Sequence, residues 1–137
     1  MSKDEKVIVL AIKPKYAEKI YSGKKRWEFR KAPPPVPSWV LLYESAPVSK
    51  ITGMVYLAAK VQGLPELVWD MVGTQKTVGG SAGITDETYR DYVGKAKSVA
   101  ACMTFNAERF DKPLEFQAGS HPPQNWGRYL IGRRGVK

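Results

Sequence analysis

The chain has 137 residues, 43% of them hydrophobic and 26% charged, which is typical of a single globular domain over residues 1–137 and not of a disordered chain. Its 22 lysines and arginines outnumber its 13 aspartates and glutamates, giving a formal net charge of +9. This surplus favours a polyanionic partner, although it is also compatible with a basic protein that is merely soluble. The single cysteine, Cys102, excludes an intrachain disulfide and fits a cytoplasmic location.

The N-terminal part of the chain predicts a strand followed by a helix. Residues 7–12 (VIVLAI) form a continuous apolar run, which is typical of a strand buried on both faces. This run is far shorter than the roughly 20 apolar residues that cross a bilayer, so we expect no membrane partner. Residues 13–23 predict a helix, because Pro14 suits a first helical turn and Gly23 can end a helix in the left-handed conformation.

The next strand, residues 25–30 (KRWEFR), alternates between two sets of side chains. We expect one set to pack in the core, namely Lys25, Trp27 and Phe29. We expect the other set to form an ionic face, namely Arg26, Glu28 and Arg30. Because these three ionic residues are roughly 6–7 Å apart along the strand, Glu28 can hold one guanidinium while the outer donors stay free for a phosphate. The alternative is a surface ion-pair ladder that binds nothing.

The remaining elements follow from proline, glycine and alternating apolar residues. Residues 31–38 (KAPPPVPS) predict a stiff extended loop, because prolines lack backbone donors. The other predicted elements are strands at 39–45 and 50–61, a helix at 64–72, a glycine-rich loop at 73–83, a helix at 84–93 capped by Thr85, and strands at 97–105 and 108–116. About six strands and three short helices predict an α+β domain in which a small β-barrel or curled sheet carries helices across its openings.

Several familiar sites are missing from the sequence. The glycines of residues 73–83 have neither the P-loop nor the dinucleotide-binding spacing. One histidine, His121, cannot form a histidine-rich metal site, and no acidic cluster has EF-hand spacing. We therefore expect no metal and no cofactor.

A family resemblance rests on the segment that contains the ionic strand. Gly23, Lys25, Glu28 and Arg30 reproduce the pattern G-x-K-x-x-E-x-R, which is similar to the signature of the ASCH domain (activating signal cointegrator homology), a branch of the PUA-like superfamily. The segments LAIKPKYAEKIYSG, VLLYESAPVSKITG and PPQNWGRYL also resemble members of this family, in the same order along the chain. The resemblance implies a PUA-like β-barrel with a cleft beside the signature strand that binds RNA or another nucleic acid.

We therefore expect a basic cleft that binds nucleic acid, with RNA favoured over DNA. Trp126 and Tyr129 lie close to several arginines and are candidates for base stacking, with packing as the alternative. We expect Trp39, Tyr43 and Trp69 in the core instead. The expected binding residues are Lys13, Lys15, Lys25, Arg26, Glu28, Arg30, Trp126, Arg128 and Tyr129.

Two alternatives remain open. In the first, the chain is a metal-independent ribonuclease or a hydrolase of a modified nucleoside, with Lys25 and Glu28 as acid and base and Arg30 stabilising negative charge. The family branch that acts on acylated cytidine uses a lysine and a threonine nucleophile three positions later. Lys25 matches that lysine, but Glu28 occupies the threonine position. In the second alternative the chain is a protein-interaction module, which would leave the concentrated cations without a function.

Overall fold

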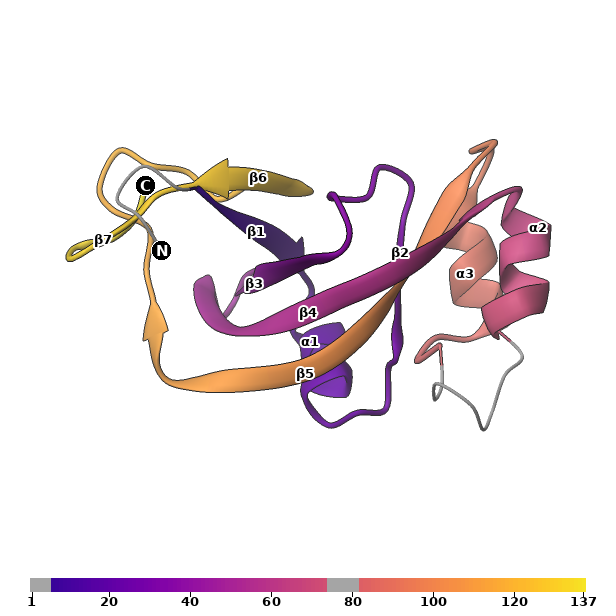
Figure 1. Ribbon diagram of the computed structural model, residues 1–137, viewed down its shortest axis with the longest axis horizontal. Coiled ribbons are helices and arrows are strands. Elements are labelled where there is room, and N and C mark those ends of the chain that lie inside the picture. Colours follow the sequence, from indigo (N-terminus) through magenta and orange to yellow (C-terminus); the bar gives the residue numbers. More distant parts are fainter. Residues whose placement is uncertain (1–5, 74–81) are drawn as a thin grey trace.

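The computed structural model describes residues 6–73 and 82–137, and its main element is a six-stranded mixed sheet (Figure 1). The strands of this sheet are β1 (Val7–Ile12), β2 (Trp27–Arg30), β3 (Ser38–Glu44), β4 (Lys50–Gly63), β5 (Val99–Leu114) and β6 (Trp126–Tyr129). A short ribbon pairs β7 (Ile131–Gly132) with β8 (Gly135–Val136). The helical elements are α1 (Pro14–Tyr21), α2 (Pro65–Val68), the π-helical turn η1 (Trp69–Gly73) and α3 (Asp86–Val93). The predicted α+β class is confirmed.

The strand order β2-β5-β4-β3-β1-β6 leaves β2 and β6 at the two ends of the sheet. The expected closed barrel is therefore not confirmed by the strand pairing. The two ends nevertheless approach each other through side chains, because Asn125 and Trp126 both donate hydrogen bonds to the carbonyl of Ala32, just beyond β2. The sheet is thus curled enough to bring its first and last strands to the same place.

Alternation along the strands divides the core between the two faces of the sheet. One face packs against α1, with Leu10, Leu42 and Ile20 fully or almost fully buried between them. The opposite face carries two separate clusters. One includes Trp27 and Phe29 together with residues of α2, η1 and α3. The other surrounds Val136 of the C-terminal ribbon.

Several local predictions are confirmed. Pro14 begins α1, and Gly23 has a φ angle of +81° just beyond the end of that helix. The hydroxyl of Thr85 accepts a hydrogen bond from the backbone N–H of Thr88, so Thr85 caps α3 as expected. The helix predicted at 64–72 begins at Pro65 but widens into the π-helical turn η1. Residues 74–81 of the predicted glycine-rich loop lie outside the described residues.

Two predictions about the sheet are wrong. The strands expected at 97–105 and 108–116 are one continuous strand, β5. Asn106 adopts a positive φ angle of 51°, and the register with β4 shifts beside it, so the extra residues form a bulge instead of a turn. Trp39, expected in the core, is 48% exposed, because the cluster around Val136 includes Leu41 but does not extend to Trp39. Tyr43 and Trp69 do pack against the core clusters.

Candidate nucleic-acid pocket

The turn after α1 and the edge strand β2 place the ionic residues. Trp27 and Phe29 are buried in the cluster that lies beneath α3. Since neighbouring residues on a strand point to opposite faces, Glu28 and Arg30 are directed to the other side, toward β1 and α1. The predicted separation of an ionic and a packed face is confirmed for these four residues.

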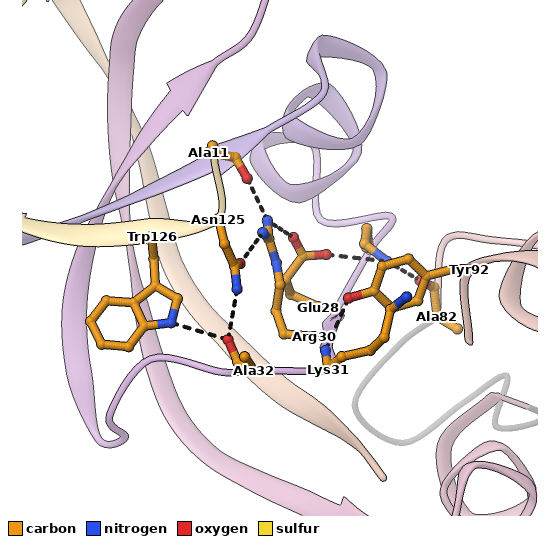
Figure 2. Close-up of polar contacts among 10 residues, drawn as sticks. Ala11, Glu28, Arg30, Lys31, Ala32, Ala82, Tyr92, Asn125 and Trp126 are labelled. Atoms are coloured by element: carbon orange, nitrogen blue, oxygen red, sulfur yellow. Dashed lines mark hydrogen bonds and ion pairs between the residues drawn. The ribbon is translucent and has the colours of Figure 1, made fainter. Parts of the chain in front are cut away.

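Glu28 is the centre of an ion network and is only 6% exposed (Figure 2). One of its carboxylate oxygens lies 3.8 Å from the Nζ of Lys25, and the other accepts a hydrogen bond of 2.9 Å from Arg30. The Arg30 guanidinium also donates to the carbonyl of Ala11 at 2.6 Å and to the Oδ1 of Asn125 at 2.9 Å. Arg30 is therefore fixed from β1, from β2 and from the segment that precedes β6.

Lys25 is the most unusual group in this network, because its side chain is only 2% exposed. Its ammonium donates a 2.7 Å hydrogen bond to the carbonyl of Ala82 and lies 5.0 Å from the centre of the Phe29 ring. Burial lowers the pKa of Lys25 to about 8; the Glu28 carboxylate opposes this shift, whereas the charges of Lys19 and Arg30 add to it. Lys25 can therefore gain or lose a proton near neutral pH.

A cavity of about 590 Å³ opens beside this network, within the size range of small-ligand sites. It is lined by the end of β1, the start of α1, β2 and one face of α3. Three cations, Lys13, Lys25 and Arg30, line it together with two carboxylates, Glu28 and Asp91. We call this cavity the basic pocket.

The wall formed by α3 was not predicted from the sequence. Thr88, Asp91 and Tyr92 line the pocket from one side of this helix. The hydroxyl of Tyr92 also accepts a hydrogen bond of 3.0 Å from the backbone N–H of Lys31, which ties α3 to the loop after β2. No local pattern signals this wall, because the sequence indicates only a capped amphipathic helix.

The basic pocket contains four of the nine predicted binding residues, namely Lys13, Lys25, Glu28 and Arg30. The other five, Lys15, Arg26, Trp126, Arg128 and Tyr129, do not line it. The C-terminal segment reaches the site through residues that were not predicted. Gln124 lines the pocket, and Asn125 holds Arg30. Both belong to the segment PPQNWGRYL, which could have indicated them.

The two rings proposed for stacking make contacts within the protein. The indole N–H of Trp126 donates to the carbonyl of Ala32, and Arg128 lies 5.3 Å from the Trp126 ring. Tyr129 packs edge-on against Phe116, and its hydroxyl donates to the carbonyl of His121. These contacts correspond to the packing alternative.

One sequence prediction about Lys25 is corrected. Lys25 was expected to share the packed face of the strand with Trp27 and Phe29. The strand begins only at Trp27, so the alternation does not extend back to Lys25. Its ammonium does lie beside the Phe29 ring of the packed face, but it also forms an ion pair with Glu28 of the ionic face, three positions along the chain. Of the two guanidinium groups that Glu28 was expected to be able to hold, it binds that of Arg30, whereas Arg26 lies beside the ring of Phe105.

The described ranges, residues 6–73 and 82–137, contain neither a helix fit to span a membrane nor a cluster of metal-ligating side chains. No helix there has the length and apolar character that a membrane span requires. Nor do those ranges bring three or more histidine, cysteine, aspartate or glutamate side chains together as a set of metal ligands.

Comparison with known proteins supports the resemblance found in the sequence. The ASCH domain family model matches residues 10–113. An ASCH domain-containing ribonuclease from Zymomonas mobilis is 30% identical over 129 residues, which cover 89% of this chain and 83% of that protein. The crystal structure of ASCH from Zymomonas mobilis matches with a TM-score of 0.75 and 27% identity over 95% of this chain and 90% of the other. A serine-to-alanine variant of that protein matches with a TM-score of 0.76 and 27% identity, over 97% and 93% of the two chains. This chain therefore belongs to the ASCH domain family.

Proposed function

We propose that this chain binds single-stranded RNA and holds one nucleotide in the basic pocket. The observation that carries the proposal is the buried arrangement of Lys25, Glu28 and Arg30 at the surface of a cavity of about 590 Å³. An RNA-related function is also consistent with the relative that is named a ribonuclease. Protein interaction alone would leave this arrangement of charges without a role.

Arg30 is suited to contact a phosphate because it is held in place but not saturated. A guanidinium has five N–H donors, and three of those of Arg30 are used by Ala11, Glu28 and Asn125. Two donors therefore have no acceptor among the described residues. Glu28 and Asn125 orient the group in advance, which reduces the entropy lost when a phosphate binds.

RNA cleavage without a metal is a second candidate, favoured by the lowered pKa of Lys25 and by the ribonuclease relative. In this mechanism Glu28 accepts the proton of a ribose 2′-OH, whose oxygen attacks the adjacent phosphorus. The bond from phosphorus to the 5′ oxygen breaks as Lys25 protonates that oxygen, and Arg30 stabilises the negative charge of the phosphorane. The products are a 2′,3′-cyclic phosphate and a 5′-hydroxyl.

The experiment incubates the protein with end-labelled single-stranded RNA and with DNA of the same sequence, in EDTA and then with added Mg²⁺ or Mn²⁺. Retarded but intact RNA supports binding, and weaker retardation of the DNA supports the preference for RNA. Cyclic-phosphate products in EDTA support the second candidate. Cleavage only after metal is added refutes the metal-independent mechanism.

Two variants link these outcomes to the pocket. Lys25→Met removes the buried ammonium but keeps an unbranched side chain of similar length, so it should lose retardation of the RNA. Arg128→Gln removes a cation that lies outside the pocket and serves as the control. If the wild-type protein neither retarded nor cleaved the RNA at low salt, both candidates would be refuted.

A further inference from the structure

A row of aromatic side chains crosses the sheet on the face opposite α1. Trp39 of β3 is the register partner of Tyr56 on β4, and Tyr56 is the register partner of Phe105 on β5. Register partners on antiparallel strands point to the same face, so the three side chains share one face across three neighbouring strands. The ring centres of Trp39 and Tyr56 are 5.2 Å apart. We call Trp39, Tyr56 and Phe105 the aromatic row.

The aromatic row is largely open to solvent. Trp39 is 48% exposed and Phe105 is 39% exposed, while Tyr56 is half-buried between them. The next residues along β3 and β4, Val40 and Val55, point to the other face and are buried against α1. The core of the sheet is therefore complete without the outer surfaces of these rings. Adjacent exposed aromatic side chains of this size indicate a contact surface.

An arginine lies at one end of the row. The guanidinium carbon of Arg26 is 5.8 Å from the centre of the Phe105 ring. No acidic side chain in the described part of the chain forms an ion pair with Arg26, so its positive charge is not compensated by a carboxylate there. Flat exposed rings beside a free cation are the combination that binds single-stranded nucleic acid, through stacked bases and a contacted phosphate.

We propose that the aromatic row is a second contact surface for single-stranded RNA, on which unpaired bases stack while Arg26 contacts a phosphate. None of these four residues lines the basic pocket, so the proposal shares only its ligand class with the proposed function. The net charge of +9 and the position of Arg26 favour a polyanion over an apolar protein surface. Since every base has a stacking face, this surface should not distinguish RNA from single-stranded DNA.

The test compares the wild-type protein and Trp39→Ala on two fluorescein-labelled RNAs of equal length. One RNA carries all its bases, and the other is abasic except for a single nucleotide. The two RNAs therefore have the same number of phosphates but differ in the number of bases that can stack. Trp39→Ala should bind the complete RNA about tenfold more weakly, within the range that alanine substitution of a stacking ring gives. It should bind the abasic RNA as the wild-type protein does.

Three further variants define what is lost. Trp39→Phe keeps a ring and should recover most of the affinity for the complete RNA. Leu67→Ala also removes an exposed apolar side chain, 58% exposed on α2, and should change neither affinity. If Trp39→Ala does not fold, Phe105→Ala applies the same test at the other end of the row, and circular dichroism checks the fold of each variant.

Unchanged affinity of a folded Trp39→Ala for the complete RNA would overturn the proposal. An equal loss on both RNAs would overturn it as well, because the effect would then not depend on bases. Failure of the pocket proposal gives a different pattern, in which Lys25→Met binds both RNAs normally while Trp39→Ala still discriminates between them.

Discussion

Replacing Lys25 with methionine should remove a pH dependence that the stability of the wild-type protein has above pH 8. Lys25 is 2% exposed, and burial lowers its pKa from 10.5 to about 8. In the unfolded chain the same ammonium is in water, and its pKa is that of an ordinary lysine. Methionine has a similar length but no charge to titrate, so only the wild-type protein should respond.

The direction of the effect follows from the number of protons bound in each state. Between pH 8 and 10.5 the unfolded chain keeps the Lys25 proton more often than the folded protein does. The free energy of unfolding therefore rises as the pH is raised from about 8 to 10.5. The stabilisation that comes from Lys25 is lost as the pH is lowered again through 8. At about 1.4 kcal/mol for each pKa unit, the whole shift corresponds to about 3 kcal/mol.

The assay is urea unfolding of the wild-type protein, Lys25→Met and Lys24→Met at a series of pH values from about 7 to about 10. Subtracting the free energy of unfolding of the variant from that of the wild type cancels the titration of other groups, including Cys102. Lys24 is the exposed neighbour of Lys25, so Lys24→Met is the control that removes a lysine without changing a buried position. If the difference in free energy of unfolding between the wild type and Lys25→Met stayed constant over this pH range, the claim that the Lys25 ammonium is buried with a lowered pKa would be refuted.

Four other measurements test the pocket and its surroundings. Arg30→Gln should weaken single-stranded RNA binding by about 1–3 kcal/mol in fluorescence anisotropy, because it removes a charge-assisted phosphate contact, and an equal loss in Arg128→Gln would contradict this. Binding should weaken with salt by a log–log slope of roughly −0.7 per phosphate contact, whereas a slope near zero would exclude a polyanion. If RNA is cleaved, Glu28→Gln should lower the rate by about 10²–10⁴ with affinity retained, and an unchanged rate would exclude Glu28 as the base. Cys102 should resist iodoacetamide in the folded protein, since burial raises its pKa to about 11, and rapid alkylation would show that it is accessible.

The parts of the fold that the sequence predicted are those with local signals. The apolar run of β1, the proline and glycine that flank α1, and the Thr85 cap of α3 each depend on a few neighbouring residues. The continuity of β5 could not be predicted in this way, because the bulge at Asn106 depends on pairing with β4. The exposure of Trp39 likewise depends on where the distant C-terminal ribbon packs.

The same division applies to the candidate site. The contact between Glu28 and Arg30 was predictable, since two residues separated by one position share a face of a strand. Strand alternation indicated that Lys25 packs in the core, but the partner of its ammonium was not predictable, because the Ala82 carbonyl that accepts its hydrogen bond is 57 positions away along the chain. Thr88 and Asp91 reach the pocket only because α3 packs beside β2, and that packing is a property of the whole fold.

The most direct test of the pocket as the RNA site is photo-crosslinking. A short single-stranded RNA containing 4-thiouridine is irradiated with the protein, and the modified peptides are identified by mass spectrometry. If a nucleotide occupies the basic pocket, crosslinks should form at the two tyrosines that line it, Tyr16 and Tyr92, and they should disappear in Lys25→Met. Crosslinks that all lie outside the pocket, or that persist at Tyr16 and Tyr92 in Lys25→Met, would contradict the proposed role of the pocket.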